Sequence, residues 1–269
     1  MVLEHQQVLN TVRALCRLTA AGGDVAKPQV CCQLAPATSA IHLLDIFCAL
    51  DAGSTLLIGP QTEPLALTQW LAHNKVTRVL GLPAVMQGLN PAEVPSLQCG
   101  IYTEMGLGAG GGLEGGWGGW VGNGGSLWQT SGRPECGMTV LQNEGGGRWK
   151  PLPGVQVRDL LRLLFWGAAR WQGLMGCRCW YSQVYILGEE REILPVGVAG
   201  ELCVAGSQVA RGYWAGGWGS DEDSVFVPNP FAEGQSNAIL VCTGDRAQWL
   251  PDGSILSKGR LREDKVGPA

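Results

Sequence analysis

The chain has 269 residues, of which 45% are hydrophobic and 16% charged, with a formal net charge of −4 and a pI near 5.4. No cluster of Lys and Arg occurs, which excludes a nucleic-acid partner held through phosphate contacts. No apolar run approaches the roughly 20 residues of a membrane span, so one large or two modest globular domains are expected.

The ten cysteines predict buried thiols rather than disulfides or a zinc site. Several lie in hydrophobic runs, among them Cys31-Cys32 and Leu202-Cys203-Val204. No Cys-x-x-Cys pair occurs, the three histidines are scattered, and the N-terminus lacks the pattern of a secretory signal peptide. We therefore expect free thiols in a reducing, cytoplasmic compartment.

Residues 1–105 alternate between helical and strand-like patterns. An amphipathic stripe and apolar runs predict helices over 3–18, 41–50 and 65–73, and a further helix that begins at Pro83. Short apolar runs between glycines and polar turns predict strands over 29–34, 55–58, 77–82 and 97–102. This alternation predicts an α/β fold, a mostly parallel sheet covered by helices.

The composition changes abruptly in residues 106–180. Glycine alternates with tryptophan in GLGAGGGLEGGWGGWVGNGGSLWQTSG, and glycine at this density costs backbone entropy on ordering. We expect this segment to be poorly ordered, with a possible short helix near Leu160–Trp166. Its composition is also what an out-of-frame or unspliced coding stretch would give.

Residues 181–269 return to strand-like patterns. Strands are predicted over 183–187 and 201–205, and two more flank the turn Pro251-Asp252-Gly253. This part is expected to form a small antiparallel β subdomain.

Two motifs in this last part carry a family resemblance. The run VGVAGELCVAGSQVARGY over 196–213 resembles the GEL-x-x-x-G-x-x-x-ARGY motif of adenylate-forming enzymes, above all the adenylation domains of nonribosomal peptide synthetases. The residues TGD over 243–245, WLPDG over 249–253 and GR over 259–260 resemble a second motif series of that family at the expected spacing. The run Asp45-Ile-Phe47 followed by AGSTL resembles the family's EIF…AGATL.

The resemblance implies a function and its cofactors. It implies that the chain is a fragment of an ATP-dependent ligase, which joins a carboxylic or amino acid to ATP with Mg²⁺. The product is an acyl-AMP, whose acyl group passes to the thiol of a phosphopantetheinyl carrier protein. The family's phosphate loop and catalytic lysine are expected to lie outside this sequence, so the chain alone is expected to be inactive.

The resemblance also implies site residues. Asp245 corresponds to the aspartate that accepts hydrogen bonds from both ribose hydroxyls, and Arg260 to a ribose-contacting arginine. The run Ser131-Gly132-Arg133-Pro134-Glu135 resembles a damaged form of the YGPTE motif, in which Gly132 and Glu135 match and Glu135 is the implied Mg²⁺ ligand.

Three positions depart from the family pattern. Ser131 replaces the aromatic residue that stacks on adenine, a loss on the order of 1–3 kcal/mol in nucleotide affinity. Ser39-Ala40 stands where amino-acid-activating relatives have the aspartate that binds the α-amine, and Arg262 stands in place of the hinge aspartate. Two alternatives therefore stay open: a non-catalytic truncated or mis-spliced product with at most weak nucleotide binding, and an acyl-CoA ligase of the same superfamily.

Overall fold

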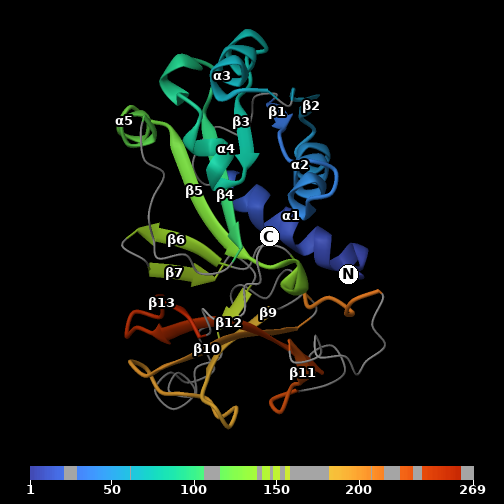
Figure 1. The fold of residues 1–269 in the computed structure, drawn as a ribbon, viewed down its shortest axis with the longest axis vertical. Helices are drawn as coiled ribbons and strands as arrows, with labels where there is room; N and C mark the ends of the chain where they lie inside the picture. Colours follow the sequence, from blue (N-terminus) through green and yellow to red (C-terminus); the bar gives the residue numbers. More distant parts are fainter. Residues whose placement is uncertain are drawn as a thin grey trace.

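The structure is a computed structural model, and the residues that it describes are 1–20, 29–60, 62–105, 116–137, 141–145, 148–151, 155–157, 182–206, 208–214, 225–232 and 238–261. Figure 1 shows an α/β body, coloured blue to green, above a β subdomain whose strands run from green (β6 and β7) through yellow to red. The expected fold class, a helix-covered parallel sheet followed by an antiparallel subdomain, is confirmed.

The α/β body is built on five parallel strands, whose bounds are β1 Val30–Gln33, β2 Thr55–Ile58, β3 Arg78–Gly81, β4 Cys99–Met105 and β5 Ser126–Gly132. They pair in the order β2-β1-β3-β4-β5. Parallel neighbours need crossover connections. The helices between the strands supply them: α2 Ala40–Asp51, α3 Pro64–His73, α4 Pro83–Gln87, η1 Pro91–Glu93 and α5 Trp117–Gly122. A longer helix, α1 His5–Ala20, precedes β1. The helices and strands predicted over residues 3–102 all form, with bounds that differ by up to three residues.

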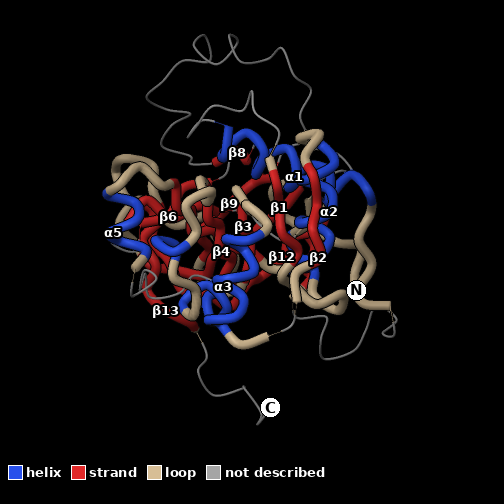
Figure 2. The backbone as a smooth tube through the Cα atoms, turned by 90° about the horizontal axis from the view of Figure 1, so that it is seen from above, coloured by secondary structure: helices blue, strands red, loops and turns tan. Residues whose placement is uncertain are grey.

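The helices cover both faces of this sheet, which Figure 2 shows from above. On one face α1 and α2 pack on side chains such as Leu80 and Ile101. On the other face α3, α4 and α5 pack on Val79 and Tyr102. Successive side chains of a strand point to opposite faces, and burial on both faces explains why these strands read as continuous apolar runs.

Part of the Gly/Trp-rich segment is more regular than its composition predicts. Residues 116–137 form α5, β5 and the 3-10 turn η2 Pro134–Cys136. The glycines leave room for tryptophan rings: a Cβ at Gly100 would lie 2.7 Å from the ring of Trp117, and one at Gly125 would lie 2.4 Å from the ring of Trp120. Glycine and tryptophan thus complement each other in packing here.

The β subdomain is mostly antiparallel. Its strands are β6 Leu141–Gly145, β7 Arg148–Pro151, β8 Val155–Val157, β9 Ser182–Leu187, β10 Ala199–Gly206, β11 Phe226–Pro228, β12 Ile239–Trp249 and β13 Ile255–Arg260. Beyond β5 the hydrogen-bonded order continues β6-β7-β13-β12-β10-β9-β8. Strand β11 pairs with the first residues of β12. The predicted hairpin at Pro251–Gly253 is the β12–β13 connection. The predicted short helix near Leu160–Trp166 lies outside the described residues.

In the part of the chain that the structure describes, no helix is long and apolar enough to cross a membrane. The eight cysteines described there are free thiols, six of them buried, which confirms the prediction of unpaired thiols for these positions.

Candidate functional site

The motif Thr243-Gly244-Asp245 forms a bulge in β12. Between Glu201 and Cys203 of β10 the register on β12 jumps from Arg246 to Cys242, so the three motif residues face Leu202 alone, two more than regular pairing needs. Gly244 has φ +72°, a left-handed conformation that glycine adopts without a Cβ clash. The Thr243 hydroxyl donates to the Leu202 carbonyl at 2.7 Å, which pins the bulge to its neighbour strand.

This bulge places Asp245 opposite Arg260. The two residues are directly paired between β12 and β13, and the Arg260 Nε lies 3.8 Å from Asp245 Oδ1. The Asp245 side chain is 2% exposed whereas the Arg260 side chain is 46% exposed. The structure therefore brings together the two residues that the sequence predicts as ribose contacts. A ribose would reach the carboxylate only after neighbouring residues move, because so little of it is exposed.

Gly132 and Glu135 lie where the parallel sheet ends. Gly132 is the last residue of β5, and Glu135 lies in the turn η2 that follows. Tyr213 donates its hydroxyl to Glu135 Oε1 at 2.6 Å, and the Ala210 N–H donates to the Glu135 carbonyl at 2.8 Å. The run ending in Ala-Arg-Gly-Tyr thus holds the predicted metal ligand, a role that the sequence does not assign to it.

Helix α1 fastens the same turn through buried polar side chains. Thr11 donates to the carbonyl of Gly137 at 2.5 Å and accepts from Gln208 Nε2 at 3.0 Å. Asn10 donates to Gln208 Oε1 at 3.1 Å, and Gln7 donates to the Val209 carbonyl at 2.5 Å. Buried polar groups that satisfy one another specify one arrangement, since each would be costly unpaired. The sequence gives no signal for this polar cluster because its contacts join residues 126 to 202 positions apart.

The buried Cys136 lies in the turn η2, next to Glu135. It packs in the core of the β subdomain with Ala247 and Trp249 of β12. Burial raises the pKa of the Cys136 thiol, and the negative charges of Glu135 and Asp245 raise it further. The turn that bears Glu135 and Cys136 follows the end of β5, at the carboxyl edge of the parallel sheet. Ligands of open α/β sheets bind at this edge.

Gly137 closes the turn and should tolerate no side chain. Its φ is +74°, and a Cβ there would lie 2.7 Å from the backbone oxygen of Gln208. We expect Gly137→Ala to lower the free energy of unfolding by roughly 1–3 kcal/mol, measured by urea denaturation. The matched control is Gly53→Ala, which has φ +60° but open space around the new methyl group. Equal losses in both variants would contradict the close contact at Gly137.

The remaining predicted positions lie away from this edge or outside the description. Ser39 is the N-cap of α2, where its hydroxyl accepts the N–H of Ile41 at 3.3 Å. Arg262 lies outside the described residues. An apolar hollow of about 520 Å³ lies between α1 and α2, lined among others by Leu9, Phe47 and Leu50, and none of the predicted site residues line it.

Comparison with known sequences supports the resemblance. The profile of the family described as AMP-binding enzyme matches residues 1–214. The chain belongs to this family. It is 50% identical over 80 residues to gramicidin S synthase 2 of Brevibacillus brevis, covering 30% of this chain and 2% of that protein. It is 30% identical over 224 residues to bacitracin synthase 3 of Bacillus licheniformis, covering 81% of this chain and 3% of that protein.

Solved structures of AMP-binding enzymes share the fold. The nonribosomal peptide synthetase FmoA3 in its AMPPNP-bound form matches with a TM-score of 0.70 and 19% identity over 96% of this chain and 26% of that one. The Vibrio cholerae adenylation domain AlmE, in complex with glycyl-adenosine-5′-phosphate, matches with a TM-score of 0.63 and 17% identity over 96% of this chain and 44% of that one. An artificially fused adenylation–PCP di-domain from Klebsiella oxytoca matches with a TM-score of 0.61 and 19% identity over 93% of this chain and 41% of that one.

These matches confirm the predicted resemblance to peptide-synthetase adenylation domains. The chain spans less than a tenth of the length of the two curated relatives named above, and about a quarter to under a half of the three solved chains.

Proposed function

We propose that this chain forms the ribose-binding part of an adenylation site that activates a carboxylic or amino acid with ATP. The observation that carries the proposal is the pairing of Asp245 with Arg260 across β12 and β13. The relatives with AMPPNP and glycyl-adenosine-5′-phosphate bound support the nucleotide as ligand. The acyl group would then pass to the thiol of a phosphopantetheinyl carrier, as the fused adenylation–PCP relative suggests.

Each residue has a defined task in this proposal. Asp245 accepts hydrogen bonds from the two ribose hydroxyls, and an ionised carboxylate makes these bonds about twice as strong as neutral ones. Arg260 donates to the ribose from the facing strand. Gly132, without a side chain, lets the nucleotide approach the end of β5.

Glu135 suits Mg²⁺ as the implied cofactor. Magnesium takes hard oxygen ligands, and it is usually held by one or two carboxylates together with substrate phosphates. Glu135 is half-buried, and one of its oxygens is oriented by the Tyr213 hydroxyl. The ion would neutralise phosphate charge as pyrophosphate leaves. Glu135 would hold the ion, and Tyr213 would fix the direction of the carboxylate.

The proposal predicts a loss of ATP affinity in two variants. Asp245→Asn keeps the shape of the side chain and removes its charge, so we expect affinity for ATP with Mg²⁺ to fall roughly 10- to 100-fold, because hydrogen bonds to charged groups contribute about 1.5–3 kcal/mol. Arg260→Ala should also weaken binding. Isothermal titration calorimetry of the full 269-residue chain measures both effects.

Arg246→Ala is the matched control for these variants. Arg246 follows Asp245 in β12 but is exposed. The Arg246→Ala variant should bind ATP with the same affinity as the unsubstituted chain. An equal loss in the Arg246 variant would point to general charge effects rather than to a ribose site.

The second candidate is a non-catalytic protein with at most weak nucleotide binding. Two observations favour it: Asp245 is 2% exposed, and a buried serine, Ser131, stands in the position of the adenine-stacking aromatic. Absence of ATP binding by the unsubstituted chain would favour this candidate over the ligase.

A further inference from the structure

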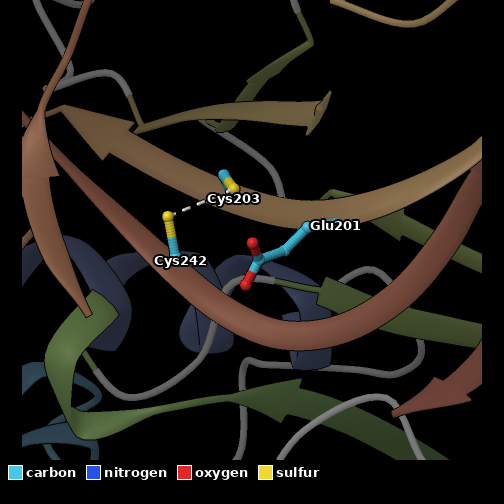
Figure 3. A group of neighbouring side chains, drawn as sticks. All are labelled: Glu201, Cys203 and Cys242. Carbon is cyan, nitrogen blue, oxygen red and sulfur yellow. Dashed lines mark hydrogen bonds between the residues drawn. The ribbon is translucent and has the colours of Figure 1, made fainter. Parts of the chain in front are cut away.

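A cluster of three side chains lies on the β subdomain and has no task in the proposed function. Cys203 of β10 is directly opposite Cys242 of β12, and their sulfur atoms lie 3.8 Å apart. Glu201 precedes Cys203 by two positions on β10, and Figure 3 shows its carboxylate directed toward the two thiols. One ligand atom from each residue lies within 4.8 Å of the other two. The β10–β12 register thus assembles two soft sulfur ligands and one oxygen ligand.

The sulfur separation fits two ligands of one tetrahedral ion. A zinc–sulfur bond is about 2.3 Å long, and two such bonds at the tetrahedral angle place their sulfurs about 3.8 Å apart. A disulfide would need the sulfurs at about 2.05 Å. The observed 3.8 Å matches the first arrangement. Glu201, whose ligand oxygen lies within 4.8 Å of both sulfurs, would complete three protein ligands by moving toward the ion, since zinc–oxygen bonds are about 2.0–2.2 Å long.

The bulge in β12 orients the carboxylate of this cluster. Gly244 donates its N–H to Glu201 Oε1 at 2.8 Å. A hydrogen bond of this kind fixes the direction of a metal-binding carboxylate and is a common feature of protein metal sites. The contact also connects the cluster to the segment that carries Asp245. Glu201 accordingly has a preset orientation before any ion binds.

The surroundings suit an ion that binds sulfur. Cys203 is buried in an apolar cluster with Tyr185 and Leu240, which excludes water from one side. Cys242 and Glu201 are half-buried, so an ion can enter from the other side. Thiolates select zinc and other thiophilic cations over Mg²⁺ and Ca²⁺, which prefer oxygen ligands.

We propose that Glu201, Cys203 and Cys242 form a binding site for a thiophilic divalent cation such as Zn²⁺, with water as fourth ligand. The site is separate from the proposed nucleotide site and uses none of its residues. An ion there joins β10 to β12 at the bulge and stabilises the folded chain by as much as it binds the folded state more tightly than the unfolded one. Sequence spacing could not predict this site, because its two cysteines are 39 residues apart and meet only through the strand register.

Cadmium titration tests this proposal, because Cd²⁺ bound by thiolates absorbs in the ultraviolet. The reduced, metal-free full chain should show a saturable increase in this absorption and a raised thermal unfolding temperature with Cd²⁺ or Zn²⁺. Cys242→Ser should lose both responses, and Glu201→Gln should bind at least about tenfold more weakly. Cys203→Ser should behave like Cys242→Ser, provided that circular dichroism shows it folded.

Cys16→Ser is the matched control, because Cys16 is a half-buried thiol outside the cluster. It should respond to the ions as the unsubstituted chain does. Equal cadmium absorption in the unsubstituted chain and in Cys242→Ser would overturn the proposal, because the ion would then be bound by other thiols. Absence of a cadmium response in the reduced, unsubstituted chain would also overturn it. The half-exposed Glu201 and Cys242 variants keep the test decisive if the buried Cys203 variant does not fold.

Discussion

Trp117→Ala should lower the free energy of unfolding by about 3–5 kcal/mol, the usual loss when a fully buried large aromatic is truncated. The Trp117 side chain is 0% exposed, its indole N–H donates to the Met86 carbonyl at 2.8 Å, and its ring meets Trp120 edge-on with centroids 5.3 Å apart. The substitution would leave a cavity and an unpaired buried carbonyl. Urea denaturation followed by circular dichroism measures the change.

Trp214→Ala is the control for this variant. Trp214 is 86% exposed, so its removal should change stability by less than about 0.5 kcal/mol. A similarly small change for Trp117→Ala would mean that α5 does not pack on the sheet. The result also bears on the hypothesis that residues 106–180 are an out-of-frame or unspliced stretch, because a packed α5 argues against it for residues 116–137.

The second large effect is a pH dependence of stability set by Asp45. Burial raises the pKa of Asp45 to about 8, and hydrogen bonds from the Ala35 and Leu34 N–H groups and the charge of Arg78 only partly oppose this. In the unfolded chain the carboxyl titrates near 3.8. The folded state therefore binds one more proton between these two values. The stability linked to this proton is fully present below about pH 3.8 and is lost as the pH rises to about 8.

Asp45→Asn isolates this contribution. The amide oxygen keeps an acceptor for the backbone N–H groups, while no charge can form. The stability of the variant relative to the unsubstituted chain should rise by about 1.4 kcal/mol per pH unit and level off above about pH 8. Between pH 3.8 and about pH 8, this gain in the relative free energy of unfolding of Asp45→Asn is on the order of 5 kcal/mol. Urea denaturation at pH values from 5 to 9 measures the difference.

Asp51→Asn is the control, because Asp51 is exposed at the end of the same helix. Its plot of unfolding free energy against pH should run parallel to that of the unsubstituted chain. A stability difference between Asp45→Asn and the unsubstituted chain that does not vary with pH would contradict the raised pKa of Asp45.

The sequence predicted the elements of the α/β body because their signals are local. Apolar runs between turn residues marked β1 to β4, and Pro83 marked the first residue of α4, where proline is best tolerated. The family motifs predicted Asp245 and Arg260 as ribose contacts, and the β12–β13 register places them opposite each other. That motif carried information about tertiary structure that local propensity lacks.

Composition was a poor guide to residues 116–137. Glycine density predicted poor order there, yet Gly100 and Gly125 leave the space that the rings of Trp117 and Trp120 fill. Packing between a glycine on one element and an aromatic ring on another depends on their distance in space, which composition does not contain.

By itself, the sequence determined the fold class, the family and the residues of the predicted ribose contact, because these rest on short-range patterns and contiguous motifs. Only the tertiary structure decided which distant groups meet: Tyr213 with Glu135, Gln208 with Thr11, and Cys203 with Cys242. These contacts join residues between 39 and 197 positions apart. Strand register and helix docking bring them together through the burial of side chains from the whole chain, so no local stretch of sequence contains them.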